Sequence, residues 1–168
     1  RGMSDLKQGV TLEIMGEGES GGPLNDAMKA DVLKHQGDIK YAIDWTTLGE
    51  FLDSLVRRGI SLNVASFVGA TSVRVHVLGE DDRDPTPAEL LQMQQLVRQA
   101  MREGALGVGS SLIYAPAFFA ETPELVAAGK EFSGEALRFF PSIGAVAEEF
   151  GKIDVALLSG VICYLPSV

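Results

Sequence analysis

The 168-residue chain has little cysteine and little positive charge. Its single cysteine, Cys163, excludes an intrachain disulfide, and we expect a reducing, cytoplasmic setting. Fourteen basic residues stand against 23 acidic ones, and a net charge of −9 repels the phosphates of nucleic acids. No apolar run approaches the roughly 18 residues that a membrane span needs. We therefore expect neither a nucleic-acid nor a membrane partner.

The scarcity of histidine and cysteine also limits the chemistry of the chain. His35 and His76 are the two histidines, and both lie far from Cys163 in the sequence. No motif joins them as a nucleophile and base, which argues against a thiol enzyme. Two histidines and one cysteine in unrelated positions also cannot complete tetrahedral zinc ligation by themselves.

Glycine is abundant, with 19 residues, and it separates short apolar runs from longer amphipathic ones. Strands are predicted over 9–15, 60–68 and 105–110, and capped helices are predicted to start at Thr47, Thr86 and Thr122, with one or two helices before the second strand. Crossovers of this length make the strands parallel. The fold class is therefore α/β, either a doubly wound sheet or part of a (β/α)8 TIM barrel.

The pattern changes after residue 130. Residues 1–130 form the regular βα segment, whereas residues 131–168 form a divergent tail. Within this tail we predict a weak helix over Pro141–Phe150 and an apolar strand over Ile153–Ser159. The tail either closes the sheet or is foreign to it.

Two carboxylates stand in the glycine-rich loop that follows the first predicted strand. In parallel α/β folds, loops at the carboxyl ends of strands carry the chemistry, so Glu17 and Glu19 are candidates for metal ligands or for proton transfer. A solvated acidic turn explains the same spacing equally well.

Two further residues fall in loops predicted after the second and third strands. Arg74, in the segment Gly69–His76, offers a guanidinium fork suited to a carboxylate, although a structural arginine is the more common case. Tyr114, in the segment Ser110–Pro116, offers a phenolic hydroxyl, although tyrosines beside a proline are as often packing residues.

Four blocks of sequence resemble the N-acyl-D-amino-acid deacylase (D-aminoacylase) family of the amidohydrolase superfamily. They are Gly9–Ser20, Trp45–Leu52, Asn63–Gly69 together with Arg74, and Glu103–Pro116. The blocks follow the order and spacing of that family over about residues 9–130. The resemblance implies an amidohydrolase-type (β/α)8 barrel in which zinc activates the water that attacks an N-acylated D-amino acid.

Departures from the family's pattern refine this expectation. The family's His-x-His pair and its later histidines and aspartate are not in this sequence, and Gly18 stands where many relatives have a metal-ligating cysteine. The resemblance thus implies a segment of a barrel that is inactive by itself. On this view Glu17 and Glu19 bind metal, while Arg74 and Tyr114 bind the carboxylate and the acyl carbonyl of the substrate.

A second class of function stays open. The chain could instead be a non-catalytic α/β binding or interaction module whose open strand edges and exposed helix faces need a partner chain, including a second copy of itself as a homo-oligomer.

Overall fold

The computed structural model describes residues 2–130 of the chain, with side chains up to Ala128. The account below concerns the compact unit Arg1–Glu131. The helix and strand predicted over residues 141–150 and 153–159 lie outside the described residues.

Short parallel strands form the centre of this unit. Strand β1 (Leu12–Met15) pairs with β2 (Asn63–Ser66), and strand β3 (Val68–Gly69) pairs with β4 (Val108–Gly109), both in parallel. The parallel pairing predicted from the long crossovers is therefore confirmed. Residues 2–130 do not by themselves show a closed barrel.

Strands β2 and β3 are two parts of one extended segment. Phe67 separates them, and its amide donates to the Met15 carbonyl over 2.8 Å, while the Val68 amide donates to the Gly107 carbonyl over 2.9 Å. The segment 63–69 thus hydrogen-bonds to β1 on one side and to β4 on the other. Its carboxyl end is where we look for a site.

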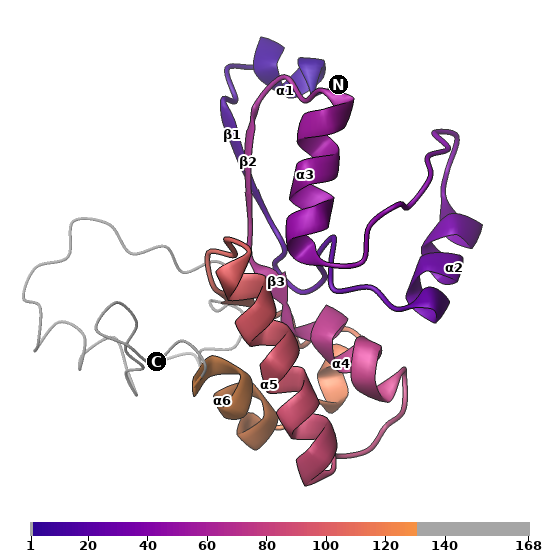
Figure 1. The fold of residues 1–168 in the computed structure, drawn as a ribbon, viewed down its shortest axis with the longest axis vertical. Coiled ribbons are helices and arrows are strands. Elements are labelled where there is room, and N and C mark those ends of the chain that lie inside the picture. The colour runs from indigo at the N-terminus through magenta and orange to yellow at the C-terminus, as the bar shows by residue number, and fades with distance from the viewer. Residues whose placement is uncertain (1, 131–168) are drawn as a thin grey trace, which may run out of the picture. The chain divides into compact units, whose positions relative to one another are not determined.

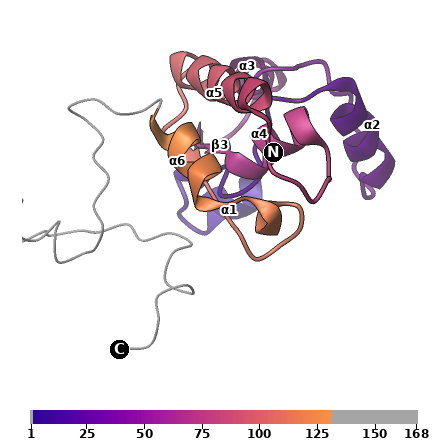
Figure 2. The ribbon, with the colours of Figure 1, turned by 90° about the horizontal axis from the view of Figure 1, so that it is seen from below.

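Helices connect the strands. They are α1 (Met3–Lys7), α2 (Asp26–His35), α3 (Leu48–Arg58), α4 (Ala70–Leu78), α5 (Pro87–Arg102) and α6 (Thr122–Lys130), with a 3₁₀ turn at Ala117–Phe119 (Figure 1). The predicted capping box of α3 is confirmed, since Thr47 and Glu50 exchange side-chain and backbone hydrogen bonds. Helices α5 and α6 lie side by side in both views (Figure 2).

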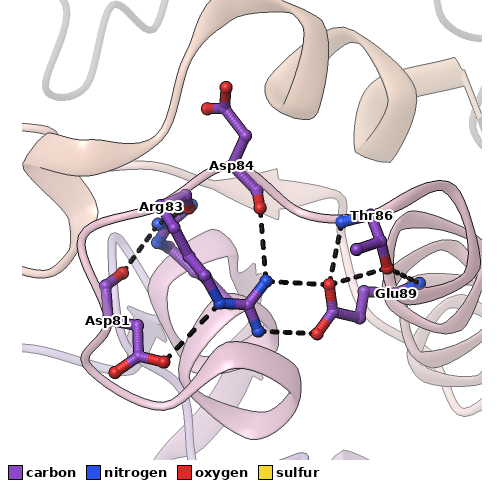
Figure 3. Close-up of polar contacts among 6 residues, drawn as sticks. Asp81, Arg83, Asp84, Thr86 and Glu89 are labelled. Carbon is purple, nitrogen blue, oxygen red and sulfur yellow. Dashed lines mark hydrogen bonds and ion pairs between the residues drawn. The ribbon is translucent and has the colours of Figure 1, made fainter.

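The start of α5 is held by a second capping box and by an arginine before it. Thr86 and Glu89 cap each other's backbone as predicted. Arg83 then places its guanidinium on the same carboxylate, with contacts of 2.6 and 2.9 Å to the two oxygens (Figure 3). Met93, Val97 and Ala100 form the buried face of the helix.

The segment predicted as a loop after the second strand is a helix. Residues Ala70–Leu78 form α4, which packs on α5, so the prediction of a loop over Gly69–His76 was wrong. The β-branched residues of this segment do not favour a helix. Burial overrides that preference, since Thr71, Ser72, Val73 and Arg74 are all enclosed.

One face of β1 stays open within the described residues. Leu12 and Ile14 share this face, as the alternating pattern predicts, yet both side chains are about half exposed, at 51% and 52%.

Among residues 2–130, none of the helices is both long and apolar enough to cross a bilayer.

Candidate functional site

The loop Gly16–Gly22 follows β1 and is called the acidic loop because it carries Glu17 and Glu19. It crosses the carboxyl ends of β3 and β4. A Cβ atom on Gly109 would lie 2.1 Å from the Gly16 carbonyl oxygen, and one on Gly69 would lie 2.3 Å from the Gly18 carbonyl oxygen. Both strands therefore end in glycine because the backbone of the acidic loop lies directly on them. Gly16 itself has φ of +90°, which favours glycine at the sharp exit from β1.

The same loop supplies the hydrogen-bond partners that the start of α4 lacks. The Thr71 amide donates to the Gly18 carbonyl over 3.0 Å, and the Gly69 amide donates to the Ser20 hydroxyl over 2.9 Å. The Ser20 amide in turn donates to the Ser72 hydroxyl over 2.8 Å. No side chain caps α4 from its own N-terminus, so this loop takes the place of a cap.

The loop is also fixed at its far end. The indole nitrogen of Trp45 donates to the Gly21 carbonyl over 2.7 Å, and the Trp45 side chain is only 6% exposed. Glu17 and Glu19 therefore project from a backbone that is held on both sides.

A cavity of about 210 Å³ lies beside this loop. Its lining includes Glu17, Glu19 and Tyr114, three of the four residues selected from the sequence, together with Thr71 and Ser111. Two βα loops that are about 95 positions apart in the chain thus meet at one site, as expected for the carboxyl end of a parallel sheet. Tyr114 is 68% exposed.

The donor set at this cavity is incomplete for zinc. Glu17 and Glu19 contribute carboxylate oxygens, which suit hard cations. Across residues 2–130, no three histidine, cysteine, aspartate or glutamate side chains come together in a way that could hold a metal ion. Zinc sites usually take three or four protein ligands, so the described residues do not fit a zinc site on their own.

Arg74, the fourth selected residue, does not line this cavity. It lies on α4, is 1% exposed, and forms an ion pair with Glu124 of α6. Its guanidinium also donates to the carbonyls of Asp81 and Arg83 over 3.1 and 2.8 Å. These contacts favour a structural role and separate Arg74 from Tyr114, with which it was predicted to share a pocket.

Sequence reasoning missed the partner of Arg74. The partner is Glu124, which lies in the first turn of α6 and is 5% exposed. Burial raises the pKa of its carboxyl, with Arg74 beside it acting in the opposite direction. No local pattern in the sequence marks this carboxylate as the partner of Arg74, because the two residues are 50 positions apart.

A larger groove of about 660 Å³ adjoins the cavity and was not predicted. It runs between α2 and α4 and shares Glu19, Thr71 and Ala115 with the cavity. His76 of α4 lies in it, and burial lowers the pKa of the imidazole. The other histidine, His35, is exposed on α2 and contacts Asp31.

Comparison with known proteins gives consistent results. No protein-family model matches the chain. It is 30% identical to a D-aminoacylase of Alcaligenes xylosoxydans xylosoxydans over 125 residues, which cover 72% of this chain and 25% of that protein. It is also 30% identical to an N-acyl-D-aspartate deacylase of the same organism over 132 residues, covering 78% of this chain and 26% of the relative.

Solved structures agree. The N-acyl-D-glutamate deacylase of Bordetella bronchiseptica, in complex with zinc and a phosphonate inhibitor, matches with a TM-score of 0.61 and 25% identity over 75% of this chain and 26% of its own. A D-aminoacylase assigned to a novel subset of amidohydrolases matches with a TM-score of 0.61 and 28% identity over 76% of this chain and 27% of its own. A D-aminoacylase with a binuclear metal centre matches equally well.

The chain spans about a quarter of the length of these relatives. Both the sequence and the fold of the described residues are shared with them, and the resemblance noted from the four sequence blocks is confirmed. The chain therefore matches a segment of the D-aminoacylases and N-acyl-D-amino-acid deacylases, which are metal-dependent amidohydrolases.

Proposed function

We propose that this chain is a segment of a metal-dependent hydrolase that removes the acyl group from N-acyl-D-amino acids, and that it contributes one side of the active site. The observation that carries this proposal is the meeting of Glu17, Glu19 and Tyr114 in one cavity at the carboxyl ends of parallel strands, in a chain that matches deacylases. The small-molecule substrate, the zinc and the cytoplasmic location are parts of the same proposal.

In this function the acidic loop supplies oxygen ligands and Tyr114 supplies a hydrogen-bond donor. Glu17 follows β1 most closely, so it is our first choice for a metal-site residue, with Glu19 second. The Tyr114 hydroxyl can orient the acyl carbonyl of a substrate in the cavity. Because residues 2–130 do not complete a zinc site, the remaining ligands come from outside them.

Titration of the 15N-labelled chain with Mn2+ tests the role of the loop. We expect the ion to broaden the amide signals of Gly16–Ser20, Ser111 and Tyr114 first, since manganese prefers oxygen ligands. The acidic turn Glu80–Asp84 is an internal control, with four carboxylates against the two of the loop after β1. Equal broadening at both loops, or no effect of Glu17→Gln on the first, would contradict the proposal.

Turnover provides a second test. The chain by itself should not hydrolyse N-acetyl-D-methionine, even with zinc added, because its ligand set is incomplete. Hydrolysis by the isolated chain would show that we have misjudged which residues the reaction needs.

The alternative of a non-catalytic module that needs a partner rests on one observation, the half-exposed Leu12 and Ile14 on β1. Size-exclusion chromatography with light scattering tests it. A homo-oligomer whose association is lost in Leu12→Ser would favour this alternative, and a clean monomer would count against it.

A further inference from the structure

The groove between α2 and α4 has the size and position of a substrate subsite. Its volume of about 660 Å³ lies within the range of roughly 300–1,000 Å³ that is typical of small-molecule sites. It also adjoins the cavity of Glu17 and Tyr114, because Glu19, Thr71 and Ala115 line both. A molecule bound in the cavity can thus extend into the groove.

Apolar side chains make up much of the wall of the groove. Val32 of α2, Val75 and Leu78 of α4, and Leu24 of the loop before α2 line it, and Leu24 and Leu78 are themselves buried. Helix α2, which forms one wall, is fixed at its start because the Asn25 side chain donates to the His76 carbonyl over 3.1 Å and caps the Met28 amide. The groove is therefore a formed feature of this unit, and its wall combines apolar side chains with polar ones.

The charged groups of the groove are all of one sign. Glu19, Asp31 and Glu80 line it, whereas no lysine or arginine is among its described lining residues. Lys29, the nearest basic residue of α2 in sequence to Asp31, donates instead to the Thr46 hydroxyl over 2.8 Å. Asp31 contacts His35, but Glu19 and Glu80 form no ion pair among the described residues. A bound carboxylate would find repulsion here and no counter-charge.

We propose that this groove receives the side chain of the amino-acid half of the substrate, and that it accepts an uncharged apolar side chain and rejects an acidic one. The inference rests on the proposed deacylase function and narrows it. The relatives include enzymes named for N-acyl-D-aspartate and for N-acyl-D-glutamate, and identity of 30% and 28% does not separate them from the D-aminoacylase. The acidic lining of the groove instead favours an uncharged side chain over an acidic one.

Binding to the 15N-labelled chain tests this selectivity without requiring turnover. N-acetyl-D-methionine and N-acetyl-D-glutamate have side chains of equal length and differ in charge. We expect the methionine derivative to bind at least about fivefold more tightly at pH 7 and low salt, and to shift the amide signals of α2 and of Val75–Leu78.

A charge reversal provides the matched variant. Glu80→Lys replaces an exposed lining residue, so folding is preserved, and it should reduce the preference for the methionine derivative at least about threefold by improving binding of the glutamate derivative. Asp53→Lys makes the same change of charge on an exposed position of α3 that does not line the groove, and it should leave the preference as it is.

The outcomes are separable from those of the metal experiment. Equal binding of the two derivatives, tighter binding of the glutamate derivative, or no binding of either would overturn the assignment of the groove, whatever Mn2+ does at Glu17. Selective binding in the groove together with no effect of Glu17→Gln on Mn2+ would keep the groove as a ligand site and overturn the hydrolase proposal instead.

Discussion

The backbone amide of Ser20 donates to the side-chain hydroxyl of Ser72 over 2.8 Å, which joins the acidic loop to the first turn of α4. The two residues are 52 positions apart in the chain and belong to different βα units. The orientation of the carboxylates in the candidate site therefore depends on a helix that follows another strand.

Ser20→Ala should loosen the loop. The Ser20 hydroxyl accepts from the Gly69 amide over 2.9 Å and donates to the Gly22 carbonyl over 2.6 Å, so its removal leaves a part-buried amide without its partner. We expect a loss of about 1–3 kcal/mol in the free energy of unfolding and faster hydrogen exchange at Gly69. Urea denaturation and amide exchange measure the two effects.

Ser54→Ala is the matched control for that variant. Ser54 is 1% exposed and its hydroxyl donates to the Phe51 carbonyl within α3, far from the acidic loop in the hydrogen-bond network. It should leave the exchange rate at Gly69 unchanged. If both variants accelerate exchange there equally, the loop is not held by Ser20.

Gly109→Ala should displace the loop from the strand ends. The new Cβ would meet the Gly16 carbonyl oxygen at 2.1 Å, a backbone contact that can be relieved only by moving the loop. Overpacking of this kind costs about 1–3 kcal/mol. Gly37→Ala, where no atom lies within 4 Å of the added Cβ, should change the unfolding midpoint little, and a similar loss in both variants would refute the close approach.

Arg74→Met should destabilise the fold strongly. It removes one partner of a buried ion pair and leaves Glu124 enclosed without a counter-charge, which costs about 3–5 kcal/mol in comparable cases. Adding Glu124→Leu should recover much of the loss. Arg57→Met, at an exposed position of α3, should have little effect in the same denaturation experiment, and an Arg74 variant as stable as this control would restore the case for a ligand-binding arginine.

The Arg83–Glu89 pair should make stability depend on pH in the acid range. The Arg83 guanidinium, followed by the Thr86 backbone and hydroxyl, lowers the pKa of Glu89 from its ordinary 4.5 to about 2. A carboxyl whose pKa is lowered in the folded state stabilises that state above pH 4.5, and its contribution is lost as the pH falls toward 2. The melting temperatures of the wild type and Glu89→Gln should therefore differ at pH 6 and converge near pH 2. A constant difference across this range would contradict the shift.

The helices that begin with a capping box could be predicted from the sequence alone. The capping boxes at Thr47 and Thr86 are made by residues three positions apart, so the helices that they start are correctly placed. Helix α4 was missed because its β-branched residues disfavour a helix and only packing against α5 decides in its favour.

The candidate site likewise combines residues that a local pattern identifies with residues that only the folded chain brings together. Glu17, Glu19 and Tyr114 could be selected because each follows a predictable strand, and the topology of parallel strands brings strand ends together. The partner of Arg74 could not be selected, since Glu124 lies 50 positions away and pairs with it only once α4 and α6 have folded. The groove depends on where α2 lies, which no local pattern specifies.

The segment between α2 and Trp45 offers a place for attaching a probe. Ile39 is 81% exposed. The Gln36 side chain donates to the Tyr41 carbonyl and the Lys40 side chain donates to the Gln36 carbonyl, so these hydrogen bonds stay within the segment. A peptide tag or fluorescent dye introduced at Ile39 should therefore leave the acidic loop and the groove undisturbed. Position 39 is thus suited to a probe that follows ligand binding in solution.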